Sequence, residues 1–182
     1  MTTKIEWCIN EDGTPGETIN PLGWGCYGPG GTPERPNRCS YCYAWRMAKR
    51  RLNKCARCNE FVPHWHPEAF TAPRLWRTSR CIFVQSMGDA FGAWVPQWQQ
   101  RDMALDLPRM YPHHTFIFLT KESQNLALWN PWPDNAWVGV TATNQRQTNA
   151  RIIALGAVQA RVRFLSFEPL LEACDVFSDL LA

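Results

Sequence analysis

From residue 81 onward, short apolar runs alternate with longer stretches whose apolar positions follow a helical spacing. The apolar runs cover residues 81–87, 114–119, 136–140 and 162–167, and each leads into Gly, hydroxyl or charged residues. Residues 96–110 and 144–157 carry the helical pattern, the second with Thr143 or Asn144 as its cap. Continuous apolar strands that alternate with helices are typical of a parallel sheet covered on both faces. The second half of the chain therefore predicts an α/β fold.

The first 80 residues have a different texture. Residues 5–7, Ile-Glu-Trp, predict a short first strand, which brings the expected sheet to about five parallel strands. Residues 10–38 are rich in Gly, Pro, Asn and Thr and predict a long loop that carries Cys26. Residues 44–52 predict a helix with a basic face. We expect one domain over residues 1–182, in which residues 43–80 form an inserted helix and a loop that could bind zinc.

Length and composition indicate the number of domains, the cellular compartment and the state of the cysteines. A chain of 182 residues with 45% apolar residues suits a single core, in which the ten Trp residues are most simply large buried side chains. The N-terminus does not have the pattern of a signal peptide, and no apolar run approaches the roughly 20 residues that span a bilayer. We therefore expect a cytoplasmic protein without membrane contact. In a reducing cytosol, the eight cysteines are better interpreted as metal or redox ligands than as disulfides.

Polar residues follow all four of the later strands. Ligands of parallel α/β folds bind at the carboxyl ends of the strands, so these residues should gather on one rim. The rim comprises the residues at strand ends, Ser86, Asp89, Thr120, Lys121, Thr141, Ser166 and Glu168. We expect Ser86, Asp89, Thr120, Thr141 and Ser166 among them to bind a nucleoside cofactor.

Cys26, Cys39 and Cys42 carry the main chemical signal. Cys39 and Cys42 are two residues apart, and Cys42 precedes a predicted helix whose N-terminus favours a thiolate. Three thiolates can hold a [4Fe–4S] cluster and leave one iron with a free coordination position. S-adenosylmethionine can chelate that iron and, after reductive cleavage, yield a 5′-deoxyadenosyl radical. These three cysteines therefore predict a radical-generating iron–sulfur site.

A second pair, Cys55 and Cys58, offers zinc alternatives. Together with Cys39 and Cys42 it resembles a four-cysteine zinc site, which would leave Cys26 without a role. Alternatively, Cys55 and Cys58 could bind zinc with His64 and His66, beside a separate iron–sulfur cluster. The remaining cysteines, Cys8, Cys81 and Cys174, are isolated and are each most simply a small buried hydrophobe.

Several blocks of sequence, taken in order, resemble a known family. They are residues 5–7, Gly25-Cys26, residues 39–44, 83–91, 118–121, 137–140 and 164–170. The chain resembles a family of uncharacterised, bacteriophage- and bacteria-associated proteins with a three-cysteine, radical-SAM-like motif. The resemblance covers nearly the whole chain and implies a partial or full (β/α) barrel with cluster ligands at Cys26, Cys39 and Cys42. It also implies functional weight on Asp89 and catalytic roles for Lys121 and Glu168, and a neighbouring three-Cys-motif protein as a partner.

Two departures from that pattern matter. Twelve residues separate Cys26 from Cys39, whereas the usual radical-SAM spacing holds three. The chain also ends soon after residue 169, where relatives continue with a further strand and helix, so we expect an open barrel in a truncated chain.

The leading functional prediction is a radical S-adenosylmethionine enzyme of unknown substrate. Nucleic acid is a candidate substrate because basic residues lie near the cluster motif: Arg46, Lys49, Arg50, Arg51, Lys54 and Arg57. The rival from another class is a zinc-stabilised nucleic-acid-binding or interaction module without catalysis. A third alternative is a degenerate relative that keeps the fold but has no turnover.

Overall fold

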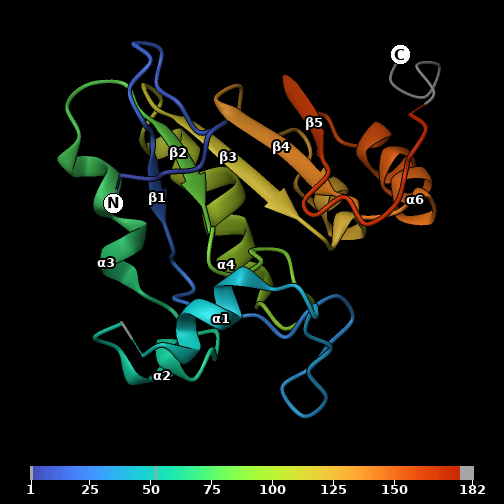
Figure 1. Ribbon diagram of the computed structural model, residues 1–182. Helices are drawn as coiled ribbons and strands as arrows, with labels where there is room; N and C mark the ends of the chain where they lie inside the picture. The colour runs from blue at the N-terminus through green and yellow to red at the C-terminus, as the bar shows by residue number, and fades with distance from the viewer. Residues whose placement is uncertain (1, 52, 177–182) are drawn as a thin grey trace.

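The computed structural model describes residues 2–51 and 53–176 and is built around one open sheet. The sheet has five parallel strands in chain order (Figure 1): β1 (Glu17–Ile19), β2 (Cys81–Val84), β3 (Thr115–Thr120), β4 (Ala136–Thr141) and β5 (Val162–Ser166). Every neighbouring pair is parallel, and the register joins Phe83 to Ile117 and Gly139 to Phe164. The sheet does not close, because β1 and β5 pair on one side only. The predicted α/β class and the strand count are confirmed.

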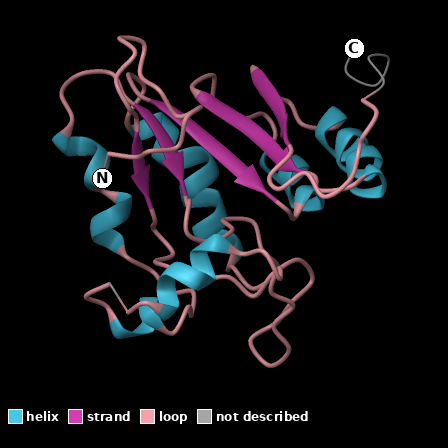
Figure 2. Ribbon diagram, in the orientation of Figure 1, coloured by secondary structure: helices cyan, strands magenta, loops and turns pink. Residues whose placement is uncertain are grey.

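Helices cover one face of this sheet. They include α4 (Gln97–Arg101), the π-helical turn η2 (Asp102–Asp106), α5 (Leu107–Met110), the 3₁₀ segment η3 (Ser123–Trp129) and α6 (Gln145–Gly156). Their buried residues, such as Met103, Leu126 and Leu155, share one core with Phe118 and Val138 of the sheet. Figure 2 shows α4 behind the strands in this view. The predicted helices at residues 96–110 and 144–157 are confirmed, and Asn144 caps α6 by accepting a hydrogen bond from the Gln147 N–H at 2.9 Å.

Within the described residues, the opposite face has no helical layer, so the cover that the sequence predicts for this face is not helical. Alternate residues of β2 and β3, such as Phe83 and Ile117, pack there in a second core with Cys8 and the partly buried Trp7. The ring centroids of Trp7 and Phe83 lie 4.9 Å apart. An extended N-terminal segment therefore covers part of this face and leaves space at the carboxyl ends of the strands.

The prediction of a first strand at residues 5–7 is wrong. This segment forms a turn, and the first strand of the sheet is β1, within the predicted loop. Ile5 and Trp7 are apolar because their side chains pack onto the sheet, whereas the backbone of Glu17–Ile19 pairs with β2. Packing and pairing give the same apolar signal in so short a segment.

The remaining helical segments lie in residues 43–80. They are α1 (Tyr43–Lys49), α2 (Ala56–Asn59), α3 (Pro67–Phe70) and the 3₁₀ turn η1 (Ala72–Leu75). Figure 1 shows α1 and α2 below the tips of the strands, where the loops that follow β1 and β2 also arrive. The predicted rim residues lie at this end of the sheet. Within the described residues, none of the helices has the length and apolar character needed to cross a bilayer.

Candidate functional site

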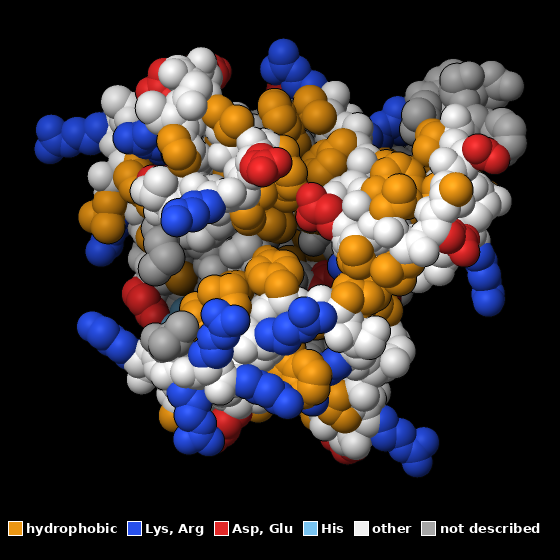
Figure 3. All heavy atoms as spheres, viewed as in Figure 1, with side chains coloured by type: hydrophobic (Ala, Val, Ile, Leu, Met, Phe, Trp, Pro, Cys, Tyr) orange, Lys and Arg blue, Asp and Glu red, His pale blue; other side chains and the backbone are white. Residues whose placement is uncertain are grey.

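A cavity of about 560 Å³ lies at the carboxyl ends of the strands. Its apolar walls include Phe83 and Leu119, which point to the helix-free face of the sheet, together with Ile5 and Trp7 of the N-terminal segment. Figure 3 shows a hollow at the centre of this face, bordered by hydrophobic side chains. The volume falls within the range of about 300–1,000 Å³ that is typical of small-molecule sites.

Cys26, Cys39 and Cys42 all line this cavity, and we call them the three-cysteine wall. Cys42 is the N-cap of α1, where its sulfur accepts a hydrogen bond from the Trp45 N–H at 3.4 Å. The Cys26 sulfur accepts one from the Gly28 N–H at 3.2 Å. Backbone N–H groups directed at sulfur stabilise a thiolate, the form of cysteine that binds metals. Both contacts therefore suit metal ligands.

The long loop between Cys26 and Cys39 folds back on itself. The Asn37 N–H donates to the Tyr27 carbonyl at 2.6 Å and closes a neck beneath the excursion of residues 28–36. Gly28 has a φ of +80°, and a Cβ atom there would lie 1.8 Å from the Asn37 oxygen. Only glycine fits so close a backbone approach. The neck brings the two ends of the loop, and with them Cys26 and Cys39, back to the same wall.

Electrostatics keep Cys26 protonated while no cation is beside it. Burial raises the pKa of its thiol, and the negative charge of Asp89 raises it further. Cys26 is thus poorly suited to act as a free nucleophile, which needs the thiolate at neutral pH. A bound cation would reverse this preference, because a coordinating thiol is deprotonated by the metal's charge.

Asp89 joins two neighbouring strand ends. One carboxylate oxygen accepts from the Thr120 hydroxyl at 2.6 Å and from the Phe91 N–H at 3.0 Å, and the other accepts from the Lys121 N–H at 2.9 Å. Burial nevertheless raises the pKa of this carboxyl group. Asp89 and Thr120 are expected above to bind a cofactor, and both line the cavity. Their polar atoms already hold the loops after β2 and β3 together.

The structure brings most of the other predicted rim residues to the cavity. Ser86, Lys121, Thr141 and Glu168 line it. The Lys121 Nζ atom lies 6.0 Å from the Tyr41 ring centroid, and the Glu168 carboxylate accepts from the Trp7 indole N–H at 2.8 Å. Ser166, at the end of β5, is not among the residues that line the cavity.

The sequence pattern did not indicate several residues at this site. Tyr41, between Cys39 and Cys42 in sequence, and Tyr43, directly after Cys42, both line the cavity. The Tyr43 hydroxyl donates to the Ser86 carbonyl. Gln85 is 2% exposed and has a φ of +64°. Its amide accepts from the Leu22 N–H at 3.0 Å and donates to the Gly23 carbonyl at 2.8 Å. A tyrosine between two cysteines is a local signal that points to the cavity, but nothing local distinguishes Gln85.

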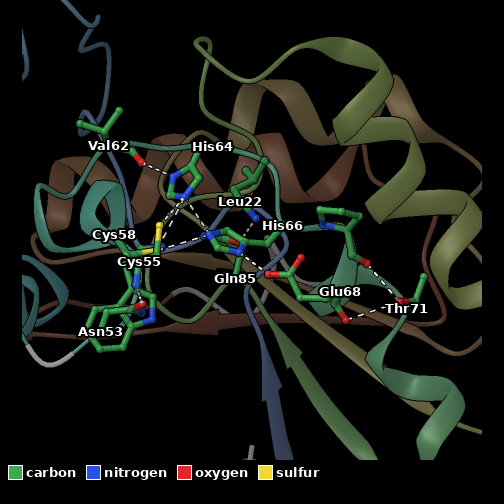
Figure 4. A network of polar contacts seen from close by, with 12 residues as sticks. Leu22, Asn53, Cys55, Cys58, Val62, His64, His66, Glu68, Thr71 and Gln85 are labelled. Carbon is green, nitrogen blue, oxygen red and sulfur yellow. Dashed lines mark hydrogen bonds and ion pairs between the residues drawn. The ribbon is translucent and has the colours of Figure 1, made fainter.

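A second cluster, which we call the Cys₂His₂ site, is formed by Cys55, Cys58, His64 and His66. Their ligand atoms all lie within 4.8 Å of one another, so they could hold one metal ion. The His64 Nε2 atom is 3.1 Å from the Cys55 sulfur and 2.8 Å from the His66 Nε2 atom, and the Cys58 sulfur is 3.5 Å from His66 Nε2. Tetrahedral zinc bonds of about 2.0–2.3 Å place neighbouring ligands roughly 3.3–3.8 Å apart. Figure 4 shows the four side chains converging on one point.

Hydrogen bonds from neighbouring groups orient these candidate ligands. The His64 Nδ1 atom lies 2.8 Å from the Val62 carbonyl, and the His66 Nδ1 atom contacts the Glu68 carboxylate. Both rings thereby direct Nε2 at the centre, as metal-binding histidines do. The Cys58 sulfur accepts from the Trp24 N–H at 3.3 Å. The donor set and its supports fit a structural metal ion.

This grouping decides between the zinc alternatives from the sequence. Cys55 and Cys58 lie with the two histidines, whereas Cys39 and Cys42 lie with Cys26 at the cavity, so the four-cysteine alternative is wrong. Among the remaining cysteines, Cys8 and Cys81 are buried as expected, but Cys174 is half-buried. All eight cysteines, which lie within the described ranges, are free thiols.

Comparison with known proteins places the chain in a family. No curated protein and no solved structure matches it. The profile of one family, described as protein of unknown function (DUF5131), matches residues 2–180. The match spans the three-cysteine wall, the Cys₂His₂ site and every strand of the sheet. The chain therefore belongs to the DUF5131 family.

Proposed function

We propose that this protein is a radical S-adenosylmethionine enzyme whose [4Fe–4S] cluster is held by Cys26, Cys39 and Cys42. The observation that carries the proposal is the backbone neck between Tyr27 and Asn37. With the excursion of residues 28–36 set aside, the path from Cys26 to Cys39 runs through Tyr27, Asn37 and Arg38. Three residues then separate the cysteines, which is the radical-SAM spacing that the linear sequence lacks.

The donor set supports a cluster over a single metal ion. Among the described residues, only the four ligands of the Cys₂His₂ site have ligand atoms close enough to share one metal ion, and the three-cysteine wall is not such a group. Its three cysteines nevertheless line the same cavity. A cubane is wider than one ion, so its ligands stand farther apart, and three thiolates leave one iron open.

The sheet supports the proposal through its topology. Five parallel strands in chain order, with helices on one face, correspond to part of the wall of a (β/α) barrel. The helix-free face would be the inside of that barrel, and Phe83, Leu119 and Thr141 line the cavity from it. We infer a partial barrel of the radical-SAM type that binds its cofactor at the carboxyl ends of the strands.

In this reading, the chain orients the cofactor and excludes water. Cys26, Cys39 and Cys42 would hold the cluster, which with S-adenosylmethionine supplies one-electron cleavage of the sulfonium S–C5′ bond to methionine and a 5′-deoxyadenosyl radical when an external one-electron donor reduces it. Ile5, Phe83 and Leu119 form an apolar wall of the cavity. Asp89 fixes the loops after β2 and β3, while Lys121 and Glu168 present charged groups to the cavity.

Anaerobic reconstitution tests this function. We expect the protein to bind about four irons and four sulfides per chain, to show an electron-resonance signal after reduction, and to convert S-adenosylmethionine to 5′-deoxyadenosine with dithionite as the electron donor. A signal that changes when S-adenosylmethionine is added would show an open iron. A colourless protein that holds only zinc after reconstitution would refute the proposal.

Nucleic acid is the substrate class that the charge distribution favours. Residues 35–59 contain eight Lys or Arg and no Asp or Glu, while the rest of the chain contains 11 Lys or Arg against 16 Asp or Glu. This basic segment includes two of the three cluster cysteines and α1. In Figure 3, the Lys and Arg side chains gather over α1 and beside the central hollow. A polyanion bound there would lie at the mouth of the cavity.

Salt-dependent binding of a fluorescent single-stranded oligonucleotide tests this surface. Replacing the exposed Arg46, Arg50 and Arg51 with alanine should weaken binding and lower the slope of log K against log salt by about 2, since each phosphate contact contributes about 0.7. The matched control replaces three other exposed arginines, Arg146, Arg161 and Arg163, which lie far from this segment in the sequence. Equal effects of the two sets would refute the proposed surface. Binding without S-adenosylmethionine cleavage would favour the non-catalytic module.

A further inference from the structure

The segment Pro21–Gly25, which leads directly into Cys26, lies between the Cys₂His₂ site and the end of β2. On one side, the His64 N–H donates to the Leu22 carbonyl at 3.1 Å and the His66 N–H to the Pro21 carbonyl at 2.6 Å. The backbone N–H groups of two candidate metal ligands, His64 and His66, are thus hydrogen-bonded to this segment. A shift of either histidine would move the segment with it.

On its other side, the same segment is fixed to the loop after β2. The buried Gln85 side chain holds Leu22 and Gly23 by two hydrogen bonds. The Gly25 N–H donates to the Met87 carbonyl at 3.1 Å, and Gly25 forms a parallel bridge with Gly88. Cys26 is therefore delivered to the cavity beside Gly88 and Asp89.

The packing between the segment and the Cys₂His₂ site leaves no room for a side chain at Gly23 or Gly25. A Cβ atom on Gly25 would lie 2.3 Å from the backbone nitrogen of Pro63, the residue directly before His64. A Cβ atom on Gly23 would lie 2.9 Å from the His66 ring and 3.0 Å from the Cys58 sulfur. The two parts are therefore in direct backbone contact, so a displacement of one must displace the other.

The loop that carries the four ligands has few anchors besides a metal ion, namely Trp65 and Phe70 on the main core and Phe61 in the small core. Its helices α2 and α3 have four residues each, which is far below the length at which a helix is stable alone. Phe61 is the large side chain that this loop buries fully, and it packs in the small core with Ala44, Ala48 and Met87. The two Nε2 atoms that face each other at 2.8 Å are both natural metal donors.

We propose that a zinc ion at Cys55, Cys58, His64 and His66 sets the position of Cys26 through the segment Pro21–Gly25. The zinc site is then a positioning device for the third ligand of the three-cysteine wall. Its consequence for catalysis rests on the proposed function, but the coupling itself concerns a free thiol and requires neither iron nor S-adenosylmethionine. The two proposals can therefore fail separately.

The test measures alkylation of Cys26 in iron-free protein with and without zinc. Zinc is quantified by plasma mass spectrometry, and iodoacetamide labelling of each cysteine is followed by peptide mass spectrometry. We expect one zinc per chain, and removal by a chelator should change the labelling rate of Cys26 by about tenfold or more, because local opening frees the segment. Labelling of Cys8, which is 0% exposed and lies outside this region, should not change.

Two variants make the test specific. His64→Ala should lose the zinc and reproduce the labelling rate of the chelated protein, whereas the exposed non-ligand His113→Ala should behave as wild type. Because coupling is reciprocal, Gly25→Ala should weaken zinc affinity by at least about tenfold, as read from displacement of cobalt and its visible spectrum. Gly156→Ala is the control, since a Cβ atom there meets no neighbour within 4 Å. Absence of zinc, or zinc binding that leaves Cys26 labelling unchanged, would overturn the proposal.

Discussion

Cys26→Ser should abolish the iron–sulfur cluster and, with it, all cleavage of S-adenosylmethionine. After anaerobic reconstitution, we expect iron to fall from about four per chain to below about one, with loss of the brown colour and of the electron-resonance signal. Two thiolates from Cys39 and Cys42 cannot hold a cubane that needs three protein ligands. Cys26 is only partly buried where it packs against the small core that contains Met87. The fold should therefore tolerate serine at this position.

The matched control is Cys174→Ser. Cys174 is also a half-buried free thiol, but its sulfur contacts the nearby Glu172 carbonyl and it lies outside both candidate sites. This variant should keep the full iron content and activity. If Cys26→Ser retained the same iron content and spectrum as Cys174→Ser, the three-cysteine wall would not be the cluster site.

The later strands could be predicted because they are buried on both faces. Runs such as residues 81–87 and 114–119 are apolar without interruption, since one set of alternate side chains packs on the helices and the other on the N-terminal segment. That pattern is strong enough to locate the later strands and to give the α/β class. It does not reveal what covers each face, and the N-terminal segment therefore escaped prediction.

The first strand was misplaced for a related reason. β1 has three residues, Glu17–Ile19, and its pattern contains one polar and one charged side chain. Its place in the sheet depends on pairing with β2, from Glu17–Ile82 to Ile19–Val84, across more than 60 residues of sequence. Local apolar content favours Ile5 and Trp7 instead, although these only pack against the sheet.

The chemistry of the site was readable only where its residues are close in sequence. Cys39 and Cys42 are brought together by one turn, as are Cys55 and Cys58. The choice between their partners depends on tertiary contacts. Cys26 reaches the cavity because the Tyr27–Asn37 neck closes the loop and because Gly25 pairs beside Met87, and neither contact has a sequence signature.

The two candidate sites share one structural element. The segment Pro21–Gly25 contacts His64 and His66 on one side and presents Cys26 on the other. Cys26 and Cys42 also pack against the small core in which Phe61, from the loop of the Cys₂His₂ site, contacts α1. A metal ion in the Cys₂His₂ site would therefore stabilise one wall of the cavity from outside.

Loss of that metal should unfold this region locally and leave the sheet intact. In Cys58→Ser, we expect amide hydrogen exchange of residues 21–26 and 53–66 to become about a thousandfold faster, which corresponds to roughly 4 kcal/mol of local stability. This estimate lies well below the about 10–16 kcal/mol with which zinc stabilises finger peptides that have no other core. None of the four ligands belongs to the main core, so β3 and β4 should keep their protection.

Chelation of the wild-type protein separates the metal from the packing of Cys58, which is 1% exposed. If the metal is responsible, the chelated wild type and Cys58→Ser should show the same exchange pattern, and added zinc should restore only the wild type. If protection falls in the variant but not on chelation, the sulfur acts through packing and its contact with Trp24. If protection is lost equally from β3 and β4, the region is part of one cooperative unit with the sheet, and the metal stabilises the whole domain instead of one wall of the cavity.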